Sequence, residues 1–179
     1  MTRLIVLLRG INVGGHRKVP MEALRELCRE LGFSRVESYI QSGNLVLSAP
    51  EGPEAVVARL EPALEERFGF AIDLVARTAE QWARYAAGSP FPEAAEQQPN
   101  LLHLALSRQP MKPGALEALR ERAVAGELVE SAGDGLWVHF PSGVARSKLS
   151  PAVFDKAAGS PVTARNWRTV LKLHEMAGA

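Results

Sequence analysis

The segment RGINVGG, residues 9–15, is the first part of the sequence whose residue types could do chemistry. It follows an apolar run, residues 4–8, and it precedes the basic residues His16, Arg17 and Lys18. Glycine backbone at the end of a strand can expose N–H groups, and a helix N-terminus and cations beside it favour a bound anion. The segment is neither a P-loop, which needs Lys-Ser or Lys-Thr, nor GxGxxG, because Asn12 replaces the middle glycine.

A second polar segment, QSGN, residues 41–44, lies between two short apolar runs and is typical of a hairpin turn. In a ferredoxin-like sheet of strand order 4-1-3-2, this turn and the glycine-rich segment meet at one edge. We therefore predict ligand-binding residues there: Arg9, Gly10, Asn12, Gly14, Gly15, Lys18, Gln41, Ser42, Gly43 and Asn44. A structural interpretation is also open, because Asn and Gly are common loop residues and could tie the two loops together.

A third set of candidates lies in the segments VARSKLS and TARNWRTVLKL, where we predict ligand binding by Lys148, Arg165 and Asn166. The spacing of the second segment predicts a terminal helix. Its expected packed face holds Trp167, Val170, Leu171 and His174, and its expected basic face holds Arg165, Arg168 and Lys172. A solvated cationic helix face is the alternative interpretation.

The sequence indicates no catalytic residue, no cofactor and no metal site. His103 and His139 fall on strands expected to be neighbours, on the same face as Trp137, without a third ligand. The single cysteine, Cys28, has the helical spacing of a stripe that faces a core. We therefore predict that Cys28 is a buried and unreactive thiol.

Two modules must position these residues. Residues 3–9, 36–40, 45–47 and 71–76 are predicted strands, and helices are predicted from Pro20 to Leu31 and after Pro53. The order β-α-β-β-α-β is that of a ferredoxin-like module, residues 1–77. A connector with a short helix capped by Thr78 spans 78–99. Residues 100–179 repeat the pattern with a helix over 114–125, but the fourth strand is expected to be missing or very short and to be replaced by a terminal helix that Thr163 caps. The predicted fold class is α+β, with two ferredoxin-like βαββα(β) modules in tandem, antiparallel sheets and helices on one face.

Composition limits the choice of partners. The 179 residues are 46% hydrophobic and 23% charged, with a formal net charge of +1, so no overall field attracts polyanions and a nucleic acid would need a local basic patch. No apolar stretch approaches the ~20 residues that cross a bilayer, and no signal peptide is recognised. We predict a cytoplasmic protein without a membrane partner, whose partner is a phosphate-containing small molecule or RNA.

Six segments, in this order and spacing, resemble the bacterial family known as domain of unknown function 1697: RGINVGG, VPM, YIQSGNLV, SPFP, SKL and TARNWRTVLKL. The resemblance runs from Arg3 to about Met176. It implies an α+β fold with two ferredoxin-like pieces, and it implies no reaction. It directs attention to the candidate residues named above other than Lys18, and to Trp167.

Three functional hypotheses follow. The first is a non-catalytic binder of a phosphate-bearing ligand, a nucleotide or RNA, at the glycine-rich loop. The second is a small-molecule enzyme with a site between the two modules, where Lys148 and Arg165 position a substrate. The third is a structural or interaction module, in which the motifs lock parts of the chain together. Substitutions that remove a lock destabilise the protein, whereas substitutions that remove a ligand contact do not.

Overall fold

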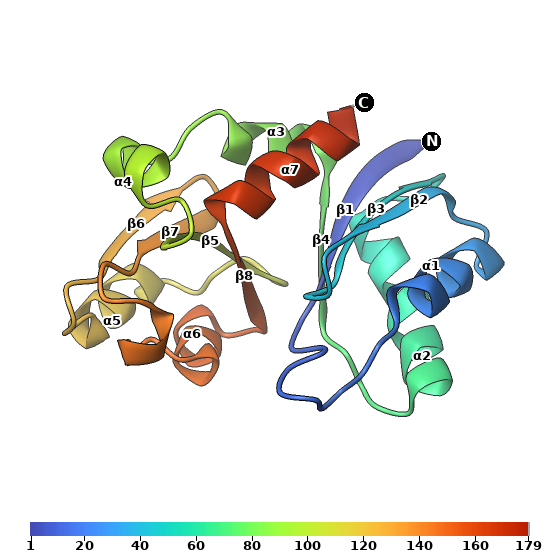
Figure 1. The fold of residues 1–179 in the computed structure, drawn as a ribbon, viewed down its shortest axis with the longest axis horizontal. Coiled ribbons are helices and arrows are strands. Elements are labelled where there is room, and N and C mark those ends of the chain that lie inside the picture. Colours follow the sequence, from blue (N-terminus) through green and yellow to red (C-terminus); the bar gives the residue numbers. More distant parts are fainter. Residues whose placement is uncertain (179) are drawn as a thin grey trace. The chain divides into compact units, whose positions relative to one another are not determined.

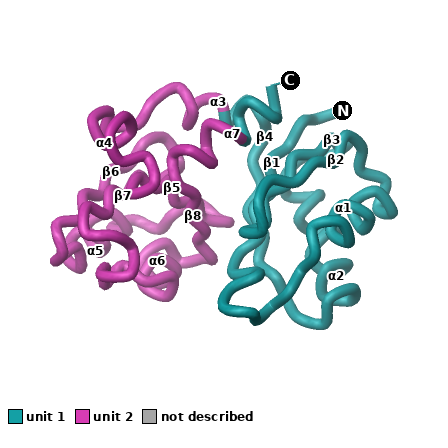
Figure 2. The backbone as a smooth tube through the Cα atoms, in the orientation of Figure 1, with its two compact units in different colours: residues 1–82, 173–179 teal, residues 83–172 magenta. Residues whose placement is uncertain are grey.

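The computed structural model describes residues 1–178 and divides into two compact units (Figure 2). Unit 1 comprises residues 1–82 and the C-terminal residues from Leu173, and unit 2 comprises residues 83–172. Each unit contains one four-stranded antiparallel sheet (Figure 1). The predicted α+β class, with two ferredoxin-like modules in tandem, is therefore confirmed.

Unit 1 has the predicted element order: β1 (Thr2–Leu8), α1 (Met21–Glu30), β2 (Ser34–Tyr39), β3 (Asn44–Ala49), α2 (Pro53–Phe68) and β4 (Leu74–Thr78). Its strands are arranged β2-β3-β1-β4, which is the predicted order read from the other edge. Several strand limits differ from the prediction, two of them next to the predicted site. β4 begins at Leu74 rather than at residue 71, and β2 ends before Ile40, whose backbone is left-handed with φ 50°.

The core of unit 1 lies between this sheet and the helices α1 and α2, which cover one of its faces (Figure 1). Leu4, Val6 and Leu8 of β1 point into this core, and Ile5 and Leu7 on the opposite face are buried as well. A strand that is buried on both faces has a continuous run of apolar residues in its sequence, rather than alternating apolar and polar residues. Cys28 on α1 is buried, as predicted, and burial raises its pKa to about 12.

In the sequence, β4 is followed by α3 (Ala79–Ala86). The hydroxyl of the preceding residue, Thr78, accepts a hydrogen bond from the Gln81 amide at 3.1 Å, so the predicted cap is confirmed. The later elements are α4 (Pro92–Gln97), β5 (Leu102–Ser107), α5 (Ala115–Arg122), β6 (Leu128–Ala132), β7 (Gly135–His139), a 3₁₀ turn (Val144–Arg146), α6 (Pro151–Ala158), β8 (Val162–Asn166) and α7 (Trp167–Gly178). The second sheet has the order β6-β7-β5-β8, the same topology as the first.

The expectation that the fourth strand of the second module is missing or very short is wrong, because β8 has five residues, as many as β4, and pairs with β5 along all of them. Thr163 and Arg165 occupy buried positions of β8, so the strand has no apolar alternation to reveal it. The predicted cap residue is also wrong. Thr163 lies within β8, and the Asn166 side chain instead accepts a hydrogen bond from the Thr169 amide at 3.0 Å.

Because residues 162–166 form β8, α7 begins later than expected and the buried residues on its faces differ from the prediction. Val170 and Leu173 are fully buried, whereas Leu171, which was predicted to pack, is 41% exposed. The predicted basic helix face is wrong as well, because Arg165 belongs to β8 and is buried. The helix starts three residues later than expected, and its buried apolar residues include Val170 and Leu173.

Candidate functional site

Asn12 joins the two polar segments of unit 1. Its side-chain carbonyl accepts a hydrogen bond from the Val19 amide at 2.8 Å, and its side-chain amide donates to the carbonyls of Val19 at 3.0 Å and Gln41 at 2.8 Å. The glycine loop (residues 9–19) and the QSGN turn (residues 40–44) therefore lie side by side, as predicted. We call these two segments together the loop rim.

The QSGN turn is shaped by close packing. Gly43 has φ 86°, and a Cβ on it would lie 2.7 Å from Ile11 Cδ1 and 2.8 Å from Leu8 Cβ, so a larger residue does not fit. Asn44 is fully buried, and its side-chain amide donates to the Tyr39 carbonyl at 2.9 Å and the Ser42 hydroxyl at 3.1 Å. Gly43 and Asn44 therefore have structural roles within the turn, and Gln41 and Ser42 are exposed.

The tip of the glycine loop is a tight hairpin. Val13 pairs with His16, whose amide donates to the Val13 carbonyl at 2.9 Å. Between them, Gly14 and Gly15 have φ values of 56° and 77°, the signs that a type I′ turn requires at both central residues. Both glycines are exposed with open space around them, and no hydrogen-bond acceptor for either amide lies among residues 1–178.

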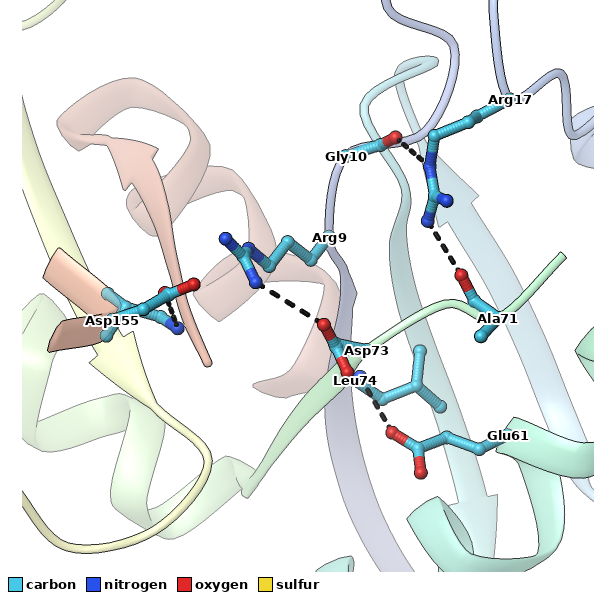
Figure 3. Close-up of polar contacts among 9 residues, drawn as sticks. Arg9, Gly10, Arg17, Glu61, Ala71, Asp73, Leu74 and Asp155 are labelled. Carbon is cyan, nitrogen blue, oxygen red and sulfur yellow. Dashed lines mark hydrogen bonds and ion pairs between the residues drawn. The ribbon is translucent and has the colours of Figure 1, made fainter. Parts of the chain in front are cut away.

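Arg17 fixes the base of the hairpin from outside the sheet (Figure 3). Its Nε donates to the Gly10 carbonyl and its terminal nitrogen donates to the Ala71 carbonyl, both at 2.8 Å. The guanidinium also lies over the Phe70 ring, 4.7 Å from its centroid. These three contacts hold Arg17 in a left-handed conformation with φ 53°, which costs an L-residue about 1–2 kcal/mol. The guanidinium therefore holds the loop in place.

Arg9 lies beside Asp73, and Figure 3 shows the two side chains pointing toward each other. The Arg9 side chain is 24% exposed, with 3.3 Å between its terminal nitrogen and the Asp73 carboxylate. The Arg9 amide also donates to the Asp73 carbonyl at 3.0 Å. A partly exposed pair at this distance contributes little to stability, about 0–1 kcal/mol.

The electrostatic character of the rim is cationic. Residues 9–19, 40–44 and 70–73 contain three cations, Arg9, Arg17 and Lys18, against one carboxylate, Asp73. Lys18 is exposed, and no hydrogen-bond partner for its ammonium lies among residues 1–178. Three residues further on, α1 begins at Met21 without a side-chain cap, so the positive end of its dipole faces this region. Backbone amides, an exposed ammonium and a helix N-terminus together can hold an anion.

The three C-terminal candidates have different surroundings in unit 2. Arg165 is buried, with its terminal nitrogen 2.8 Å from the Thr163 hydroxyl and 2.9 Å from the Ala164 carbonyl, and burial lowers its pKa to about 10. Asn166 caps α7, and Lys148 lies on an exposed loop. Their roles in ligand binding stay predictions.

The two strand histidines lie on opposite faces of the second sheet, which contradicts the prediction. Trp137 pairs with Leu104, so it shares a face with His139, whereas His103 faces the other side. Burial, together with the charge of Arg165, lowers the pKa of His103 to about 4. Among residues 1–178, no group of three or more His, Cys, Asp or Glu side chains could hold a metal ion.

Sequence reasoning missed Ile40, which lies next to Gln41 in the QSGN turn. Its φ is 50° and its surface is 50% exposed, an unusual combination for a β-branched residue. It also missed Val13, which is 62% exposed at the hairpin tip. One sequence signal could have identified both residues: each lies beside a glycine-containing turn. An apolar side chain at such a position has few neighbouring residues to pack against.

The family model described as "Protein of unknown function (DUF1697)" matches residues 1–137, which include the whole loop rim. A conserved bacterial protein from Streptococcus pneumoniae, SP0830, has a similar structure with a TM-score of 0.78 at 22% identity, covering 100% of this chain and 99% of that one. An unknown protein from Galdieria sulphuraria gives a TM-score of 0.28 at 14% identity over 92% and 98% of the two chains. No curated protein matches. Among residues 1–178, no helix has the length and apolar character to span a membrane.

Proposed function

We propose that this chain, which belongs to the DUF1697 family of proteins of unknown function, binds a phosphate-bearing ligand, a nucleotide or RNA, at the loop rim of unit 1. The observation that carries the proposal is that the glycine loop contains two groups of residues, those that hold the loop in place and those whose polar groups are exposed. The side chains of Asn12 and Arg17 donate to backbone carbonyls and hold the loop. Lys18, Gly14 and Gly15 are exposed, and neither the ammonium nor the two glycine amides has a hydrogen-bond partner among residues 1–178.

A loop held in this way loses little conformational entropy when an anion binds, and preorganised N–H donors gain affinity for that reason. The interlocking alternative accounts for Asn12, Gly43 and Asn44, whose contacts are all within the chain. It leaves Lys18 without a role, since the ammonium is exposed and contributes nothing to the lock. Phosphate binding gives this cation a function, because an ammonium pairs with a phosphate as a point charge.

Titration of the full chain tests the proposal. We expect ADP, followed by calorimetry, and a labelled single-stranded RNA, followed by anisotropy, to give at least one measurable affinity. That affinity should weaken between about 50 mM and about 200 mM salt, because phosphate contacts release counterions. Lys18→Ala should weaken it about fivefold to tenfold through loss of one charge-assisted contact.

Lys156→Ala is the matched control, because Lys156 is also an exposed lysine but lies on α6 of unit 2. It should leave the affinity unchanged, and both variants should unfold within about 0.5 kcal/mol of the wild type. Absence of binding by both probes at low salt would contradict the proposal, and so would equal losses in the two variants. The enzyme hypothesis and the cytoplasmic location stay predictions from the sequence.

A further inference from the structure

Ile40 is held in an unfavourable conformation without a compensating contact in the core of unit 1. Its φ of 50° places a β-branched residue in the left-handed region, at a cost of about 1–2 kcal/mol that Gly or Asn would largely avoid. Half of its surface is exposed, and it lies outside the core cluster of unit 1. Backbone strain of this kind clusters at active sites and ligand-binding sites.

The other left-handed residues of the loop rim differ from Ile40. Asn12 belongs to a residue type that tolerates this region, and its side chain makes three hydrogen bonds. Arg17 is compensated by two hydrogen bonds and by its contact with Phe70. Ile40 therefore differs from both in keeping an exposed apolar side chain at the surface.

The contacts of Asn12 bring together the two segments that carry three exposed side chains. Asn12 is bonded to Gln41 and to Val19, and consecutive Cα atoms are only about 3.8 Å apart. Val13, Ile40 and Lys18 are each one residue from an atom in those bonds. The rim therefore contains two aliphatic side chains, 62% and 50% exposed, and one exposed ammonium group.

The combination of two exposed aliphatic side chains and one ammonium group favours some classes of ligand over others. A free phosphate would use the ammonium and the backbone amides but would leave both aliphatic side chains in water. A protein partner needs a larger surface, since stable interfaces bury roughly 800 Å² on each partner. A nucleoside phosphate fits, because its base offers a planar apolar face of about the size of these two side chains and its phosphate offers the charge.

We infer that the ligand of the loop rim is a nucleoside phosphate whose base packs on Ile40 and Val13 while its phosphate is held by Lys18. This inference rests on the proposed function and narrows it to one chemical class. Ligand sites commonly combine apolar walls with a few polar groups that fix orientation, and the rim has both parts.

Two ligands with the same phosphate test it: adenosine 5′-monophosphate and ribose 5-phosphate, which lacks the base. We expect calorimetry on the full chain to show about tenfold tighter binding of the nucleotide, from coverage of the aliphatic side chains. Ile40→Asn should remove most of that difference and leave the ribose 5-phosphate affinity unchanged. Lys18→Ala should weaken both ligands by the same factor.

Ile40→Asn should also keep or raise the melting temperature, because Asn tolerates the left-handed region better than Ile. Val124→Asn is the control for loss of an exposed aliphatic residue, since Val124 is 65% exposed in unit 2, and it should leave both affinities unchanged. Equal affinity of the wild type for the two ligands would overturn the inference and leave the proposed function standing. A clear loss of melting temperature in Ile40→Asn would overturn it too, because Ile40 would then be a packing residue. No binding of either ligand, of ADP or of RNA would overturn the proposed function itself.

Discussion

The two units share a strand order and differ in how the first loop of each sheet is held. In unit 1, residues 9–20 join β1 to α1, and Asn12 ties this loop to the turn between β2 and β3. In unit 2, residues 108–114 join β5 to α5, and this shorter loop is tied to the end of α6 instead. The amides of Lys112 and Gln109 donate to the Ala158 carbonyl at 3.0 Å and to the Ser160 hydroxyl at 3.1 Å.

The turns between the second and third strands differ in the same way. The QSGN turn of unit 1 is packed against the glycine loop, whereas Asp134 in the turn of unit 2 accepts a hydrogen bond from the Tyr85 hydroxyl of α3. One topology therefore supports two different sets of loop contacts. Because the two units share the sheet topology and differ in their loops, the hydrogen-bonded tie between the first loop and the following hairpin turn is a feature of unit 1.

The largest expected difference between the units comes from their turn glycines. Gly43→Ala should lower the free energy of unfolding by about 4 kcal/mol, from the clash with Ile11 and Leu8 and from strain at a positive φ. Gly133→Ala should cost only about 1 kcal/mol, because φ is 62° there and the space around it is open. Urea unfolding followed by circular dichroism measures both. Equal losses would show that the QSGN turn is no tighter than its counterpart.

The second largest expected effect on the free energy of unfolding comes from Asn12, which ties the glycine loop to the QSGN turn. Asn12→Asp keeps the shape of the side chain but replaces a donor with a carboxylate that faces the carbonyls of Val19 and Gln41. We expect a loss of about 3 kcal/mol at neutral pH, from two missing hydrogen bonds and from the repulsion. The loss should shrink at acid pH, because the folded state raises the pKa of the introduced carboxyl and protonation restores a donor. A loss that does not change with pH would contradict this account.

The parts of the fold that were predicted correctly depend on local signals. Apolar runs identified β1 and β3, glycine and proline marked the helix ends, and the β-α-β-β-α-β order then limited the sheet to one arrangement. The strand β8 was missed because Thr163 and Arg165 are buried polar residues, which imitate a loop in sequence. Their burial depends on tertiary contacts that a local pattern does not contain.

The candidate site was predicted in position but not in detail. Topology brought the glycine loop and the QSGN turn together, and the Asn12–Gln41 hydrogen bond confirms it. The inward direction of Asn12 and Arg17 depends on rotamers and on left-handed backbone, neither of which composition reveals. The strained conformation of Ile40 was also unpredictable, because its residue type argues against that conformation.

The smallest expected effect comes from the second asparagine of the comparison, Asn166 of unit 2. Its side chain only accepts, from the Thr169 amide at the start of α7, so a carboxylate can replace it. Asn166→Asp should change the free energy of unfolding by less than about 0.5 kcal/mol, or stabilise slightly through the helix dipole, whereas Asn166→Ala should cost about 1 kcal/mol. The same Asn-to-Asp change is therefore expected to be harmful in unit 1 and harmless in unit 2. If Asn166→Asp instead destabilised the protein as much as Asn12→Asp, Asn166 would also donate an essential hydrogen bond, and the contrast between a two-way tie and a simple cap would be lost.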